Sequence, residues 1–196
     1  MKVRSALALI TSVGLIAASC EGSTPPLTNA EPRVTGAPPE VARCSASGLS
    51  TSRTVEPRLP KAVAATRSAI AEGAIACDFE GLAQLALADG NFVWSFGSDA
   101  SPSVADLAAE WRRAEQQGDD IMATLVQLLD LRHARRGRDF VWPSAFGTAP
   151  NETDWAQLEA VYDAEEIAAF SEFGAYIGWR TGIGKDGDWN FFVQGE

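Results

Sequence analysis

An apolar run at the start of the chain ends at a cysteine and separates the first residues from whatever folds after them. Lys2 and Arg4 precede a continuous run of mainly Ala, Leu, Ile and Val from Ser5 to Ala18. A basic start followed by such a run is typical of a secretory signal peptide, whereas a membrane-spanning helix needs about 20 apolar residues. We therefore predict a cleavable signal peptide at residues 1–19 and no permanent span.

The end of this run indicates a lipid anchor. The segment Leu15-Ile16-Ala17-Ala18-Ser19-Cys20 resembles a lipobox, the site where bacterial lipoprotein signals are cut immediately before a cysteine that becomes acylated. Small residues precede Cys20 as in that pattern, while Ala17 stands where the pattern prefers Leu. The resemblance implies a lipoprotein with acyl chains such as palmitate on Cys20, and two or more chains anchor a protein stably. The alternative is ordinary secretory cleavage, which leaves Cys20 as a thiol or half of a disulfide.

Two further segments follow the signal. Residues 20–40 are rich in Pro, Gly, Ser, Thr and Ala and have hardly a large apolar side chain, so we expect the lipid anchor site and a disordered tether reaching up to about 60 Å. Residues 41–196 have the length of a single domain. The chain is 46% hydrophobic with six Trp, enough for a core, and its net charge of −10 argues against a nucleic-acid partner.

The remaining cysteines, Cys44 and Cys77, form an even pair. In an exported protein such a pair predicts a disulfide, here closing a loop of about 33 residues and stabilising the fold by roughly 3 to 4 kcal/mol. Two free thiols are the alternative. A metal or catalytic role is disfavoured because His133, the single histidine, is distant in sequence. We expect no metal and no cofactor.

Helical spacing of apolar residues and capping signals predict a series of helices. Asp78 is expected to cap the second of them, while Ser103 with Asp106 and Asp163 with Glu166 read as capping boxes. The expected helices span residues 60–76, 79–88 and 103–116, then one after Asp119-Asp120, one around Trp155–Tyr162 and a short one after Asp163.

Aromatic and β-branched runs predict the strands. They lie at Phe92–Phe96 and Phe140–Trp142, with a closing hairpin of Tyr176–Ile183 and Trp189–Val193 around a Gly-rich loop. We therefore expect an α+β domain, with helices packed on a small, mostly antiparallel sheet that ends in a C-terminal β-hairpin. A cone-shaped curved sheet wrapped by helices, as in nuclear-transport-factor-like folds, is one candidate by analogy of fold.

Four segments of the domain carry a wider resemblance: Cys44-Ser45-Ala46-Ser47-Gly48-Leu49-Ser50, Ala76-Cys77-Asp78-Phe79, Phe92-Val93-Trp94-Ser95-Phe96-Gly97 and Tyr176-Ile177-Gly178-Trp179-Arg180. Together they look like small bacterial, especially actinobacterial, lipoproteins and secreted proteins of unassigned function. The likeness covers about Val41 to Glu196. It implies a location and a fold and brings no active site.

One basic run contains candidate catalytic or anion-binding residues. His133 stands among arginines between Arg132 and Arg138, which fits a general base or an anion-binding cluster. The interpretation we favour is a helix C-terminus rich in cations, because the helix dipole favours positive charge there, followed by a solvated loop.

The acidic groups have ordinary explanations. Asp186, Asp188 and Asn190 alternate like the first ligands of a calcium loop, but Phe191 stands where such a loop needs Gly, so a hairpin turn is preferred. Asp163, Glu165, Glu166 and Glu172 are expected on a capped, solvated helix rather than as paired catalytic carboxylates. The six Trp fit a core better than a ligand groove.

Two interpretations of Tyr176 and Arg180 stay open. Arg180 lies between Gly178 and Gly182, whose missing side chains would leave its guanidinium accessible over Tyr176. Plain surface is one interpretation, and a recognition face made of Tyr176 and Arg180 is the other.

The function hypothesis follows from the predicted location of the protein in the cell. No spacing specifies a catalytic residue, so we expect a cell-envelope lipoprotein, extracytoplasmic and held at a bacterial membrane, that presents a binding or scaffolding domain to an envelope protein or a small ligand. The alternative is a small extracytoplasmic hydrolase or ligand-processing enzyme that uses His133 or the acidic helix.

Overall fold

The computed structural model describes residues 43–51, 59–95 and 102–195. The predicted signal peptide, the lipid site at Cys20 and the tether at 20–40 lie outside the described residues. Among the helices of the described residues, none is long and apolar enough to cross a membrane.

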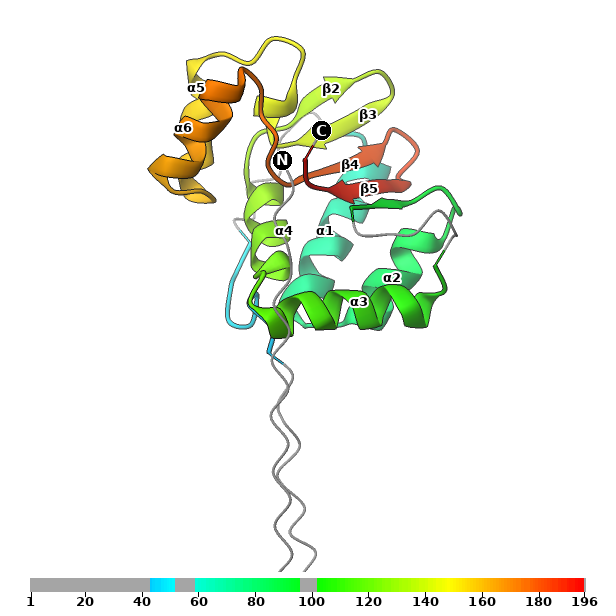
Figure 1. The fold of residues 1–196 in the computed structure, drawn as a ribbon. Helices are drawn as coiled ribbons and strands as arrows, with labels where there is room; N and C mark the ends of the chain where they lie inside the picture. The colour runs from blue at the N-terminus through cyan, green and yellow to red at the C-terminus, as the bar shows by residue number, and fades with distance from the viewer. Residues whose placement is uncertain (1–42, 52–58, 96–101, 196) are drawn as a thin grey trace, which may run out of the picture. The chain divides into compact units, whose positions relative to one another are not determined.

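The described residues form six α-helices, two short 3-10 helices and five strands (Figure 1). The helices are α1 (Lys61–Ile75), α2 (Phe79–Leu87), α3 (Val104–Gln117), α4 (Ile121–Asp130), η1 (Ser144–Phe146), α5 (Glu152–Ala156), η2 (Gln157–Ala160) and α6 (Ala164–Phe173). The strands are β1 (Val93–Trp94), β2 (Ala134–Arg136), β3 (Asp139–Trp142), β4 (Arg180–Gly184) and β5 (Trp189–Val193).

The five strands make one mixed sheet in the order β1-β5-β4-β3-β2. Three neighbouring pairs are antiparallel, and β1 alone pairs in parallel with β5. The predicted α+β class with a C-terminal hairpin, β4–β5, is therefore confirmed. The central strand β4 is buried along its whole length.

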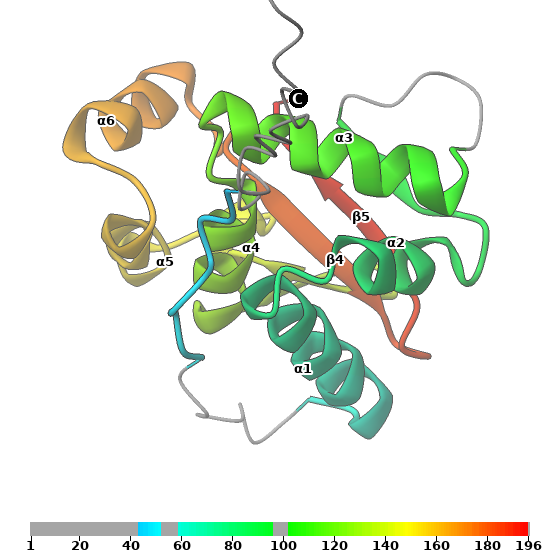
Figure 2. The same cartoon turned by 90° about the horizontal axis from the view of Figure 1, so that it is seen from below.

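Four helices, α1 to α4, gather on one face of the sheet (Figures 1 and 2). Local capping explains where two of them begin. The Asp78 carboxylate accepts from the Gly81 N–H at 2.9 Å at the start of α2, and Ser103 with Asp106 forms the capping box of α3. Gly118 ends α3 in the left-handed conformation, with φ 94°. These helix boundaries follow the sequence closely because each depends on residues a few positions apart.

The main core lies between these helices and the sheet, and aromatic rings dominate its centre. The Trp94 ring stacks on Trp179 with centroids 5.4 Å apart, and Trp111 stacks on Trp189 at 6.0 Å. Phe192 packs against Trp179 at 4.7 Å. These tryptophans are buried and fill space rather than line a groove, so the preference for a core is confirmed for them.

A second, smaller core forms beside the β2–β3 end of the sheet. Its buried members come from η1, η2, the turn after η2, α6 and the chain before β4: Ala145, Leu158, Tyr162, Phe170 and Tyr176. The α5–α6 segment projects from the rest of the domain on the left of Figure 1. Phe173 at its end is 53% exposed.

Four details differ from the sequence-based expectations. The strand expected at Phe92–Phe96 pairs only at Val93–Trp94 among its described residues, and the strand expected from Tyr176 begins at Arg180. The helix expected around Trp155–Tyr162 is a short α5 followed by η2. The largest difference is β2, because Ala134–Arg136 was expected to be a solvated loop.

Candidate functional site

The unexpected strand β2 carries the basic run. A two-residue turn, Gly137-Arg138, joins β2 to β3, and Gly137 has φ 61°, a left-handed conformation that Gly adopts without strain. Arg136 pairs with Asp139 across the turn and Ala134 pairs with Val141. In the described part of the chain β2 has no strand on its other side, so the arginines stand on the end strand of the sheet.

Four arginines lie on or beside this strand, and we refer to them together as the arginine edge: Arg132, Arg135, Arg136 and Arg138. The guanidinium carbon of Arg135 lies 4.3 Å from the Phe140 ring centroid, and that of Arg136 lies 4.3 Å from the Phe146 centroid. Each ring supports a guanidinium by a cation–π contact. These contacts orient the charges and leave Arg135 and Arg136 exposed.

The members of the arginine edge differ in how their charge is neutralised. Arg138 donates to Asp186 at 3.0 Å, and an Arg132 nitrogen lies 3.9 Å from Asp154. Arg135 donates to the Gly137 carbonyl, and among the described residues neither Arg135 nor Arg136 has a carboxylate partner. Within the described ranges the edge therefore presents two cations without a carboxylate partner, in a chain whose net charge is −10.

Arg180 lies beneath the same edge. Only 7% exposed, it places its guanidinium carbon 4.5 Å from the Phe146 centroid and donates to the Gly195 carbonyl. Phe146 thus contacts two guanidinium groups, from Arg180 and Arg136. Burial and, to a smaller extent, the charge of the neighbouring Arg136 lower the pKa of Arg180. The buried Arg180 guanidinium therefore adds positive charge beneath the exposed Arg136.

The expectation that Arg180 is accessible over Tyr176 is wrong. Tyr176 is 4% exposed and Arg180 rests on Phe146. The flanking glycines make room for other groups: a Cβ at Gly178 would come within 2.7 Å of the Tyr176 hydroxyl, and one at Gly182 would meet the Phe191 ring at 2.2 Å. The two residues form internal contacts and have no free face.

Tyr176 belongs to a buried hydroxyl pair. Its oxygen lies 2.8 Å from that of Tyr162, which accepts from the Trp179 N–H at 2.8 Å, while the Tyr176 hydroxyl donates to the Trp179 carbonyl. Burial raises the pKa of Tyr162 to about 12 and that of Tyr176 well above its ordinary value. Both therefore stay neutral and fasten the chain where it enters β4.

An internal network fixes the base of the arginine edge. The buried Ser144 hydroxyl donates to Asp154 at 2.5 Å, and the Gln157 amide donates to Ser144 at 2.5 Å and accepts from the Arg132 N–H at 2.7 Å. Burial alone would raise the pKa of Asp154, but hydrogen bonds from Asn151 and Ser144 and the Arg132 charge hold it below its ordinary value. Asp154 is therefore a stable anion that anchors Arg132.

His133 lies half-buried against aromatic rings. Its ring centroid is 5.3 Å from that of Phe140 and 5.5 Å from that of Trp142. The helix α4 ends at Asp130, before the arginines, so the favoured interpretation of the basic run as a helix terminus is wrong. The physical reason is that the run forms a hairpin with β3 instead.

The other candidate residues have structural roles. The sulfur atoms of Cys44 and Cys77 lie at disulfide distance, 2.14 Å, as predicted. In the hairpin, Asp186 pairs with Lys185 and Arg138. Asn190 donates to Asp139 at 2.9 Å. No group of three or more potential metal ligands lies together within the described ranges.

The acidic helix is capped as predicted. Asp163 accepts from the N–H groups of Glu165 and Glu166, each at 2.9 Å, and the Glu166 carboxylate accepts from the Asp163 N–H. Glu165, Glu166 and Glu172 are exposed, so they stand on a solvated surface of α6.

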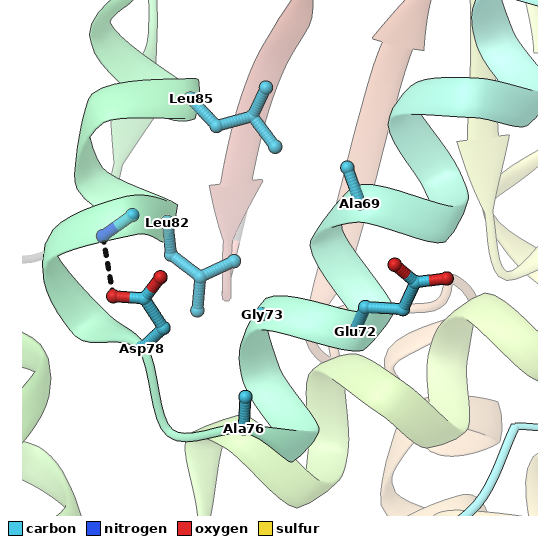
Figure 3. Close-up of a pocket in the computed structure, with 8 residues that line it drawn as sticks. Ala69, Glu72, Gly73, Ala76, Asp78, Leu82 and Leu85 are labelled. Carbon is cyan, nitrogen blue, oxygen red and sulfur yellow. Dashed lines mark hydrogen bonds between the residues drawn. The ribbon is translucent and has the colours of Figure 1, made fainter.

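A shallow groove of about 460 Å³ lies between α1 and α2 (Figure 3). Its walls are mostly small or aliphatic: Ala69, Gly73, Ala76, Gly81, Leu82 and Leu85, with Glu72 and Asp78 at its margins. Gly73 lets the helices approach, because a Cβ there would lie 2.9 Å from Leu82. The Asp78 carboxylate is engaged in capping α2, which leaves the groove few polar groups to orient a ligand.

Comparison of the chain with protein-family models, with curated proteins and with solved structures found no match. The sequence predicted only part of the arginine edge. The basic run was evident, whereas its position on an end strand was not. The Gly137-Arg138 turn between a basic and an aromatic segment is the signal that could have found it.

Proposed function

We propose that this chain is a bacterial cell-envelope lipoprotein, anchored through Cys20, whose folded domain is a binding module for an acidic partner protein. The basic start, the apolar run and the lipobox-like junction support the anchor. The disulfide between Cys44 and Cys77 supports an oxidising compartment. The arginine edge is the binding surface in this proposal.

One observation supports the binding role above the others. Arg135 and Arg136 are exposed, are oriented by aromatic rings and lack a carboxylate partner among the described residues, although acids outnumber bases 26 to 16 in the chain. Arginine is suited to such a surface because its planar guanidinium binds carboxylates through two parallel hydrogen bonds. Complementary charge also steers a partner toward the correct face.

A charge-reversal experiment tests the binding role. A fluorescent Glu-rich peptide is titrated with the full chain at low salt, and Arg135→Glu/Arg136→Glu is compared with the control Arg43→Glu/Arg113→Glu. Both double variants change the net charge equally, and the control arginines are exposed and already paired with Asp120 and Glu110. We expect at least tenfold weaker binding for the edge variant alone. Equal weakening in both variants would reject the edge as the site.

A second experiment tests the anchor. The full-length chain and its Cys20→Ala variant are expressed in a bacterial host fed a labelled fatty acid. We expect label and membrane association in the first chain and neither in the variant, because the acyl chains attach to this sulfur in the proposal. Equal labelling of both would remove Cys20 as the acylated residue.

The hydrolase alternative stays a prediction. Its candidate base, His133, contacts the Phe140 and Trp142 rings, and the acids of α6 are separate and solvated. Screening the purified protein against ester, peptide and glycan substrates, with His133→Ala as the control, tests this alternative. Hydrolysis that disappears in that variant would favour the enzyme.

A further inference from the structure

We propose that the acidic partner binds as an extended segment that pairs with β2 and lengthens the sheet by one strand. This inference rests on the proposed function, since it uses the same arginine edge. It adds the backbone as a second recognition element beside charge.

The position of β2 makes its outer side available for pairing. Within the described residues β2 is the last strand of the sheet and pairs with β3 alone. In antiparallel pairs, residues alternate between those whose backbone groups face the neighbouring strand and those whose groups face away. Arg136 and Asp139 close a two-residue turn and face each other, so Arg135 directs its N–H and C=O away from β3.

The side chains place a cation on each face of this strand. Arg135 lies over Phe140, and Arg136 lies over Phe146, which belongs to η1. Successive side chains of an added strand would point to the two faces in turn. A segment with acids at adjacent or alternate positions would therefore meet Arg135 on one face or Arg136 on the other.

Charge also selects the kind of partner. A second copy of β2 paired across this edge would bring Arg135 and Arg136 against identical arginines, and like charges on facing strands are destabilising. Cations on an end strand protect it from self-association for this reason. Carboxylates on an added strand would instead attract Arg135 and Arg136. The occupant that fits is therefore an acidic, extended part of another protein.

A peptide pair separates strand pairing from simple charge attraction. The first peptide alternates Glu with Val or Thr over seven residues, and the second has the same sequence with an N-methyl group on every backbone amide nitrogen, so that neither edge of its strand can donate. Their charges are equal, but only the first can donate hydrogen bonds along a strand. With the full chain in calorimetry, we expect the methylated peptide to bind at least tenfold more weakly.

A matched pair of protein variants tests strand pairing by changing the backbone of β2 instead of the peptide. Arg135→Ala and Arg135→Pro lose the same charge, and the proline also removes the outward N–H while leaving the groups that face β3 intact. We expect Arg135→Pro to bind the unmethylated peptide clearly more weakly than Arg135→Ala. Circular dichroism and thermal melting identify any variant that unfolds, and the peptide pair tests the inference without a substitution.

The outcomes are distinguishable from those of the charge-reversal experiment. If both peptides bind equally and Arg135→Glu/Arg136→Glu abolishes binding, the acidic-partner function stands and strand addition is overturned. If neither peptide binds, both proposals fail. Binding of vesicles that contain anionic phospholipid, with both peptides left free, would also overturn strand addition and would identify the edge as a lipid-facing surface.

Discussion

The carboxylate of Glu115 accepts hydrogen bonds from both the backbone N–H and the hydroxyl of Ser45, at 2.5 and 2.8 Å, across 70 residues of sequence. Glu115 is wholly buried and also accepts from the Met122 N–H at 2.8 Å, at the start of α4. The Ser45 hydroxyl in turn accepts from the Ala123 N–H at 2.9 Å. One carboxylate therefore caps a helix and fastens the segment that begins at Cys44.

Replacing Glu115 by Ala should destabilise the domain strongly. The change leaves three buried or half-buried donors without an acceptor, and each such group costs about 1 to 3 kcal/mol. We expect a loss of at least roughly 3 kcal/mol in the free energy of unfolding, measured by urea denaturation. Ser45→Ala, which keeps its N–H bond, should lose less, about 1 kcal/mol. A Glu115→Ala loss below that of Ser45→Ala would contradict the described network.

Opening the disulfide should lower stability without abolishing the fold's secondary structure. The bond between Cys44 and Cys77 spans 33 residues, for which loop-closure entropy corresponds to about 3 to 4 kcal/mol. Cys44→Ser/Cys77→Ser should therefore melt at a lower temperature than the oxidised chain. Adding reductant should shift the parent protein toward the variant and leave the variant unchanged, and a shift in both would implicate another group.

The stability of the domain should depend on pH through two neighbouring carboxyl groups, those of Asp188 and Asp89. A hydrogen bond with Asp89, then burial and the Asp89 charge, raise the pKa of Asp188. A raised pKa means that the folded state favours the protonated form. The stability contributed by this group is therefore present below its unfolded pKa and is lost as pH rises through the folded value.

The variant Asp188→Asn should reproduce the protonated state. We expect a higher melting temperature than the parent at pH 7 and no difference near pH 3, where Asp188 is protonated in both folded and unfolded chains. Asp186→Asn serves as the control, because its partners Lys185 and Arg138 lower the pKa of Asp186 and the sign should reverse. A stabilisation by Asp188→Asn that persists at pH 3 would show that charge is not the cause.

Removing the Tyr176 hydroxyl should weaken the second core. Tyr176→Phe deletes the hydrogen bond to the Trp179 carbonyl and the contact with the Tyr162 hydroxyl, both buried. Since a net hydrogen bond contributes about 1 kcal/mol, we expect a loss of roughly 1 to 2 kcal/mol in urea denaturation. Acidic-peptide binding should be unchanged, and a large loss of binding in the folded variant would restore Tyr176 as a recognition residue.

Features with short-range causes were predictable from the sequence. Asp78, Ser103 with Asp106, and Asp163 with Glu166 all act within three residues, and each caps the helix that it was expected to cap. The second hairpin strand, Trp189–Val193, has the predicted bounds for a similar reason, because a Gly-containing turn precedes an aromatic run.

Features with long-range causes were not predictable. Asp120 lies at the start of α4 as expected, but the buried acceptor at this helix end comes from elsewhere: Asp120 has φ 47° and forms no side-chain cap, and the Glu115 carboxylate of the preceding helix accepts from the Met122 N–H. Glu115 lies four positions after Trp111 on the apolar stripe of α3, and this spacing is the signal that could have marked it as buried.

The candidate site was missed for two related reasons. Ala134–Arg136 lacks the apolar alternation of a strand, since β2 is the end strand of the sheet in the described part of the chain and its two arginines are exposed there. Arg180 was expected to be exposed, but β4 lies between β3 and β5, and a central position in the sheet follows from pairings that no local pattern reveals.

The order of the strands also determines when the sheet can be completed. β5 lies between β1 and β4, so it joins a strand about a hundred positions upstream to its own hairpin partner. A nascent chain that ends before Trp189 lacks the strand with which Val93 and Trp94 pair in the described fold, and it also lacks the core rings of Trp189 and Phe192. The parallel pairing of β1 with β5 therefore forms only after the last strand has been synthesised, and this long-range contact is expected to slow completion of the sheet.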